Sequence, residues 1–149
     1  MTNGTPIGDA MLRPESLQRR EMDGITVEHR SQPSKPHHQM LLEENHVVMH
    51  LSNSTLEITL DGDRLSRRMV PGDLHILPQG TTVASRLSDD CEMLVISFSN
   101  TVLSQIESES SSACTLRPLL GIRNLHLQNF LAAMREELRH GCPAGDVYF

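Results

Sequence analysis

The feature that most constrains the fold is a series of short apolar runs that fills residues 25–98. Each run has the length of a β-strand, and most of them alternate apolar and polar residues or are rich in β-formers. The runs are ITVEHR, MLLE, VVMHL, TLEITL, RLSRRMV, DLHIL, TVASRL and CEMLVISF. Turn residues separate them at short intervals, and this arrangement predicts a closed or sandwiched antiparallel β fold.

Three of the separating turns have a clear conformational basis. Asp61-Gly62 is a dipeptide that tolerates the positive φ angles of a tight hairpin. Pro71-Gly72 and Pro78-Gln79-Gly80 form two further corners. The short run between these two corners is therefore expected to be a strand.

Helices are expected only after residue 98. Residues 100–106 (NTVLSQI) predict a short helix, and the serine-rich residues 107–114 predict a polar loop. A longer helix is expected over residues 124–140, with Asn124 as its N-cap and with Gly141 and Pro143 after its end. Its apolar stripe consists of Leu127, Leu131, Met134 and Leu138.

These elements predict one domain that is mainly β with C-terminal helices. Residues 1–23 mix Gly, Pro and charged residues without a period, so we expect an irregular arm there. The barrel is expected over residues 24–106, and a loop with one or two helices is expected over residues 107–149.

Composition excludes several classes of function. Thirteen Lys and Arg residues against 19 Asp and Glu residues give a net charge of −6, the wrong sign for a domain that neutralises phosphates by itself. Aromatic residues make up only 3%, which leaves little for stacking on bases. No apolar run is long enough for a membrane span or a signal-peptide core, so we expect a cytoplasmic protein without membrane contact. The three cysteines are far apart, and we expect reduced thiols at Cys91, Cys114 and Cys142.

The most specific motif is the stretch from Gly72 to Gly80 (GDLHILPQG), in which five residues separate a glycine from Pro-x-Gly. Gly72 permits a sharp entry to a strand, and Pro78 with Gly80 fixes the exit turn. This stretch resembles the first part of the second cupin motif, although the same pattern occurs in unrelated hairpins.

The order of the segments resembles the amino-terminal half of AraC-family transcription regulators. Arg117-Pro118 and residues 121–124 (GIRN) carry this part of the resemblance, just before the predicted C-terminal helix. The resemblance implies a cupin-like, jelly-roll β-barrel that senses a small effector or mediates dimerisation. The partners that it implies are a small-molecule effector, a second copy in a homodimer, and DNA that only a C-terminal helix-turn-helix domain would contact.

That DNA-binding domain is missing from this chain. Asp146 is a good helix N-cap, and the apolar residues after it begin a helix that does not continue past Phe149. We therefore expect a fragment of a longer regulator that does not bind DNA by itself. The alternatives are a small stand-alone cupin enzyme, such as an isomerase or dioxygenase, and a non-catalytic cupin binding module.

The metal ligands of cupin enzymes are only partly present. Metal-dependent cupins resemble one another in an early His-x-His and Glu set and in a later His after the Pro-x-Gly turn. In this chain His38 and Glu43 match two early positions, but Pro36 stands at the first one and Val83 stands at the later one. Two ligands hold a divalent ion weakly, so we expect no metal, no cofactor and no enzymatic activity.

Histidines are nevertheless dense in the predicted barrel, at positions 37, 38, 46, 50 and 75. Hydrogen-bonded wall residues are the expected role, with a non-standard metal site as the alternative. We expect any small ligand to lie inside the barrel, within reach of some of His38, His50, His75 and Arg86.

The apolar stripe of the last helix has two candidate partners, its own barrel and a second copy of the chain. We expect part of the stripe to pack against the barrel core and the remainder to mediate dimerisation. The stripe consists of Leu127, Leu131, Met134 and Leu138.

Overall fold

The computed structural model of the chain describes residues 15–110 and 116–140. Three groups of expectations lie outside these described residues: those for residues 1–14, for residues 111–114 of the serine-rich loop, and for residues 141–149. Cys114 and Cys142 lie outside them as well. The described strands are β1 (Glu15–Met22), β2 (Ile25–Gln32), β3 (Lys35–Leu41), β4 (Asn45–His50), β5 (Ser54–Leu60), β6 (Asp63–Met69), β7 (Leu74–Leu77), β8 (Thr82–Leu87), β9 (Cys91–Phe98) and β10 (Leu119–Ile122). The described helices are α2 (Asn100–Ser110) and α3 (Leu125–Arg139).

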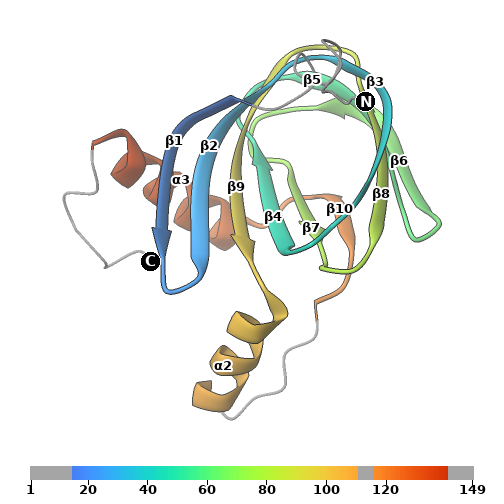
Figure 1. Cartoon of the computed structure of the whole chain (residues 1–149). Helices are drawn as coiled ribbons and strands as arrows, with labels where there is room; N and C mark the ends of the chain where they lie inside the picture. Colours follow the sequence, from blue (N-terminus) through green and yellow to red (C-terminus); the bar gives the residue numbers. More distant parts are fainter. Residues whose placement is uncertain (1–14, 111–115, 141–149) are drawn as a thin grey trace, which may run out of the picture.

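Two antiparallel sheets face each other and form a cupin-like jelly roll (Figure 1). The larger sheet has the strand order β1-β2-β9-β4-β7-β10, and the smaller sheet has the order β3-β8-β5-β6. Consecutive strands such as β7 and β8 lie in different sheets, and the predicted strand between the corners at Pro71-Gly72 and Pro78-Gln79-Gly80 is β7. The predicted fold class is confirmed.

The larger sheet separates two apolar clusters. One cluster fills the space between the sheets and includes Leu56, Leu60 and Val95. The other lies between the outer face of the larger sheet and α3, where Val27, Met49 and Leu94 meet the helix. Figure 1 shows α3 behind β1 and β2, and both strands contact the helix. Because side chains alternate along each strand, one strand such as β4 supplies both clusters.

The predicted hairpin at Asp61-Gly62 is confirmed. Asp61 has φ 47° and Gly62 has φ 87°, the positive pair of a tight two-residue turn between β5 and β6. The same dipeptide occurs at Asp23-Gly24, where φ is 51° and 81°, and it joins β1 to β2.

That second hairpin corrects the expectation of an irregular arm up to residue 23. Residues 15–22 form β1, which pairs with β2 along most of its length. β1 is an edge strand with few apolar residues, so the turn and the backbone hydrogen bonds define it rather than an apolar pattern.

The other boundaries follow the predictions closely, with three differences. α2 continues to Ser110 and so includes the first four residues of the predicted serine-rich loop. β3 begins at Lys35 and contains Pro36. An edge strand tolerates proline because the amides on its outer edge donate no hydrogen bond to a neighbouring strand. β10 was not predicted. α3 is confirmed, because Asn124 caps it by accepting a hydrogen bond from the Leu127 amide.

Neither described helix combines the length and the apolar character that crossing a membrane requires.

Candidate functional site

A cavity of about 130 Å³ lies between the two sheets, inside the barrel; we call it the lumen. Its walls are mainly aliphatic, from Val48 on β4, Ile58 on β5, Val83 on β8 and Val95 on β9. The polar residues that line it are Arg30, Gln32, Lys35, His46, His50, His75 and Ser85. An apolar space with a few polar groups is the usual composition of a small-molecule site.

Strand alternation brings three histidines to the lumen. His46 and His50 are four residues apart on β4, so both face inward, whereas Val47 and Met49 between them pack toward α3. His75 lies on β7, the neighbour of β4 in the larger sheet. The pairing of these two strands places His50 and His75 side by side.

His50 and His75 form a direct hydrogen bond. Their Nε2 atoms are 3.0 Å apart, and the rings meet edge to face with centroids 5.0 Å apart. Burial lowers the pKa of His50 to about 4 and, together with the neighbouring His50, lowers the pKa of His75 to about 3. Both rings are therefore neutral at pH 7.

A contact from β10 decides which nitrogens carry the protons. The Gly121 amide donates to His75 Nδ1 over 2.9 Å, so Nδ1 of the neutral ring carries no proton and Nε2 does. His75 Nε2–H then donates to His50 Nε2, and the proton of His50 lies on Nδ1. In the described structure His50 Nδ1 is buried and has no hydrogen-bond partner.

This proton arrangement also bears on metal binding. A nitrogen that carries a proton cannot coordinate a metal, so His75 Nε2 is unsuitable as a ligand while Gly121 occupies Nδ1. Within residues 15–110 and 116–140, no group of three or more His, Cys, Asp or Glu side chains is arranged to hold a metal ion. Val83, at the position of the later cupin His, is part of the apolar wall.

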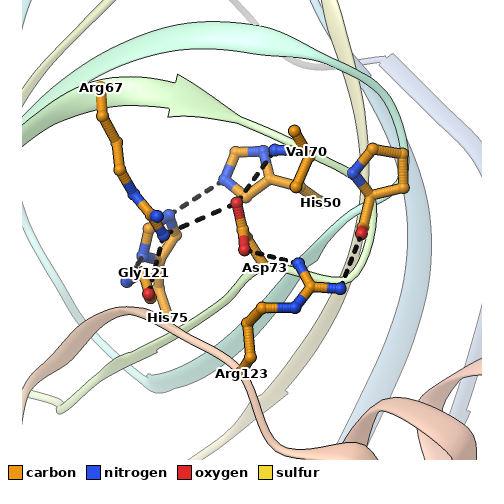
Figure 2. Close-up of polar contacts among 8 residues, drawn as sticks. His50, Arg67, Val70, Asp73, His75, Gly121 and Arg123 are labelled. Atoms are coloured by element: carbon orange, nitrogen blue, oxygen red, sulfur yellow. Dashed lines mark hydrogen bonds and ion pairs between the residues drawn. The ribbon is translucent and has the colours of Figure 1, made fainter.

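Behind the histidine pair, a buried carboxylate holds β10 and the start of α3 to the barrel (Figure 2). Asp73 accepts hydrogen bonds from the Val70 amide at 2.9 Å and from Arg123 Nη1 at 2.8 Å, and Arg67 lies 3.6 Å away. Burial raises the pKa of Asp73, but these donors and the two guanidinium charges outweigh it and lower the pKa below its usual value. Arg67 also donates to the Gly121 carbonyl over 2.8 Å, so Gly121 is held at both its amide and its carbonyl.

Arg30, His46 and Lys35 bring further polar groups to the lumen. Arg30 forms an ion pair with Glu28. Burial and the Arg30 charge lower the pKa of His46 to about 4, so this ring is neutral as well. Burial also lowers the pKa of Lys35.

Two of the four predicted ligand-binding residues, His50 and His75, line the lumen, and the other two do not. His38 lies exposed on β3, and Arg86 is exposed on β8, 3.8 Å from Glu57. The prediction overlooked Lys35, Arg30 and His46 as lumen residues. The spacing of His46 and His50 on one strand was the signal that could have placed His46 beside His50.

The predicted dimerisation stripe lies mostly inside the chain. Leu131, Met134 and Leu138 are buried against the outer face of the larger sheet, and Leu127 is partly buried beside them. Core packing therefore accounts for these residues, and dimerisation through the stripe stays a prediction. The more exposed apolar side chains of α3 are Leu125 and Phe130.

No protein-family model matches the chain. No curated protein matches it either.

Solved structures resemble it in fold. The chain is similar to a putative mannose-6-phosphate isomerase from Ralstonia eutropha, with 24% identity and a TM-score of 0.47 over 66% of this chain and 94% of that one. It is similar to the cupin domain of Cnp3 from Schizosaccharomyces pombe, with 12% identity and a TM-score of 0.48 over 68% and 72% of the two chains. A cupin superfamily protein from Desulfitobacterium hafniense has 15% identity and a TM-score of 0.48 over 66% and 93%.

One sequence prediction needs correction on these findings. The chain was expected not to be an enzyme because two cupin metal ligands are replaced, yet a putative isomerase is among the similar structures. The regulator part of the AraC resemblance receives no support from these structures. The similar structures include cupin-domain proteins, and this chain itself has the two facing antiparallel sheets of a cupin-like jelly roll.

Proposed function

We propose that this chain is a cupin module that binds a small molecule inside its barrel. The observation that carries the proposal is the mainly apolar lumen of about 130 Å³, whose walls include three neutral histidines and a lysine. An apolar cavity of about 150 Å³ holds one benzene molecule, so the lumen is suited to a ligand of about that size.

The polar side chains of the lumen support binding rather than simple packing. A core that serves stability alone avoids buried groups without partners, because each costs about 1–3 kcal/mol. Here His50 Nδ1 is buried without a partner among the described residues, and Lys35 stands in a partly apolar setting. Such groups are typical of sites that complete their interactions with a ligand.

The test is NMR of methyl groups during titration with toluene and benzamide. The lumen methyls of Val48, Val83 and Val95 should shift on binding, whereas those of Leu131 and Leu138, on the far side of the larger sheet, should not.

A matched pair of variants on β8 shows whether the lumen is the site. Val83→Phe fills the lumen and should abolish the shifts, whereas Ala84→Phe, whose side chain is on the other face of the strand, should leave them. Shifts that are equal in both groups of methyls, or that survive Val83→Phe, would contradict the proposal.

A finer form of the proposal is that the module is the sensing and dimerising half of a cytoplasmic AraC-type regulator, which contacts DNA through a further domain. The observation in its favour is that Gly121 contacts the histidine pair and Asn124 caps α3, so the residues that carry the resemblance connect the lumen to a helix. Its test is an anisotropy titration of promoter DNA with this chain and with the full gene product. Specific, competitor-resistant DNA binding by this chain alone would contradict the proposal that a further domain contacts the DNA.

A further inference from the structure

Lys35 lies between two spaces of the barrel. It is the first residue of β3, where it pairs with Leu87 of β8, and its side chain lines the lumen. It also lines an outer groove of about 500 Å³, together with His37 and Arg86. Lys35 therefore stands where the outer groove and the lumen meet.

The other cationic side chains of these two spaces already have carboxylate partners. Arg30 of the lumen is paired with Glu28, and Arg86 of the groove lies 3.8 Å from Glu57. Lys35 forms no ion pair with any residue in the described part of the chain. The lining of the groove also contains no Asp or Glu, in a chain whose net charge is −6.

An ammonium group in this position has lost part of its hydration without gaining a counter-ion. Burial lowers the pKa of Lys35, and among the described residues a charge on Cys91 would oppose this effect. Burial raises the pKa of that thiol to about 11, so Cys91 is neutral at pH 7 and gives Lys35 no partner. Because folding has already removed part of the water from the ammonium, pairing with an anionic ligand would add little further desolvation cost for the lysine.

We propose that Lys35 binds the anionic group of a small carboxylate ligand, whose apolar body fills the lumen. This inference rests on the proposed function, and it adds the chemical class of the ligand. The basic lining of the outer groove favours the approach of an anion, and the aliphatic wall of Val48, Ile58 and Val95 suits an uncharged body of benzene size.

Three probes of similar size separate charge from shape. Benzoate carries the carboxylate, benzamide replaces it with a neutral planar group, and toluene keeps only the apolar body. We expect the native chain to bind benzoate at least about tenfold more tightly than benzamide, because a charge-assisted hydrogen bond to an ammonium is worth more than a neutral one. Dissociation constants come from NMR titration at pH 7 and fixed ionic strength.

Variants at two cations identify the residue responsible. Lys35→Met keeps most of the length of the side chain and removes its charge, so benzoate should lose its advantage over benzamide. Lys35→Arg should retain the preference. Arg86→Met is the matched control, because it removes a cation of the same groove that lies outside the lumen lining, and the preference should persist.

Each outcome decides a different point. If toluene or benzamide binds in the lumen but benzoate has no advantage, or if the advantage survives Lys35→Met, the inference about Lys35 is wrong and the proposed function stands. If none of the three probes binds, the proposed function fails, and the inference fails with it.

Discussion

At the scale of single residues, the neutral histidine pair is the most informative feature of the lumen. His50 and His75 are each about 2% exposed, and one backbone amide, that of Gly121, decides the protonation of both rings. The order of donors runs from Gly121 to His75 and from His75 to His50. It leaves an N–H on His50 as the buried group without a partner.

This order predicts the tautomers directly. Long-range proton–nitrogen NMR at pH 7 should show His75 protonated at Nε2 and His50 protonated at Nδ1. His75→Phe removes the donor to His50 Nε2, and the His50 ring should then change its tautomer distribution, whereas His46→Gln, a change to a lumen histidine outside this pair, should not alter it. A protonated Nδ1 on His75 in the native chain would contradict the assignment.

At the scale of elements, two glycines with positive φ have different surroundings. Gly62 (φ 87°) is in the β5–β6 turn, and a Cβ there would meet nothing within 4 Å. Gly121 (φ 62°) is in β10, and a Cβ there would come within 2.6 Å of Arg67 Nη2 and 2.7 Å of Leu65 Cδ2. The turn requires only backbone freedom, whereas a side chain in β10 would also displace the ends of Arg67 and Leu65.

Alanine at each glycine should therefore have a different cost. We expect Gly62→Ala to lower the free energy of unfolding by about 1–2 kcal/mol, the cost of a left-handed alanine. Gly121→Ala should lower it further, because β10 or its neighbours must also move, and it should weaken the contact of the Gly121 amide with His75. Urea denaturation of the two variants measures the difference. Equal losses would show that Arg67 and Leu65 move aside freely.

The role of α3 can be tested with a buried and an exposed residue of the same helix. Leu131 is 0% exposed against the larger sheet, and Phe130 is 48% exposed. Leu131→Ala should cost about 2–5 kcal/mol of unfolding free energy, and Phe130→Ala should change it by no more than about 0.5 kcal/mol. Urea denaturation and light scattering at several protein concentrations provide the measurement. A change of molar mass for Leu131→Ala without loss of stability would instead support dimerisation through the stripe.

At the scale of the whole molecule, the burial of three neutral histidines makes the free energy of unfolding depend on pH. The pKa values of His46 and His50 fall to about 4 and that of His75 to about 3, from an ordinary value of 6.5. Between these values the unfolded chain binds more protons than the folded chain, so stability rises with pH. The stabilising contribution is fully present above about pH 6.5 and is lost as the pH falls toward 4.

The free energy of unfolding should therefore decrease steeply from pH 6.5 to 4.5. Each histidine that stays neutral only in the folded state contributes up to about 1.4 kcal/mol per pH unit. His46→Gln should reduce the slope by about one proton, and His37→Gln, an exposed residue of β3, should leave it unchanged. Urea denaturation at half-unit pH intervals measures the slope. A flat profile over this range would show that the histidines take up protons without unfolding.

Local chemistry in the sequence determined most of the architecture. The alternating runs predict strands β4 to β9, Asp61-Gly62 predicts its hairpin, and Asn124 predicts the start of α3, because side-chain periodicity, positive φ and capping are properties of a few neighbouring residues. The same information identified His50 and His75 as candidate site residues.

Only the tertiary structure decided how these residues act. Strand register and the pairing of distant strands bring His50 to His75 across 25 positions of sequence, and they leave His38 and Arg86 on the outside. β10 was not recognisable as a strand, because what holds it is the pairing with β7 and the contacts of Gly121 with Arg67 and His75. Lys35 likewise owes its place between the groove and the lumen to the closure of the barrel, which no local pattern encodes.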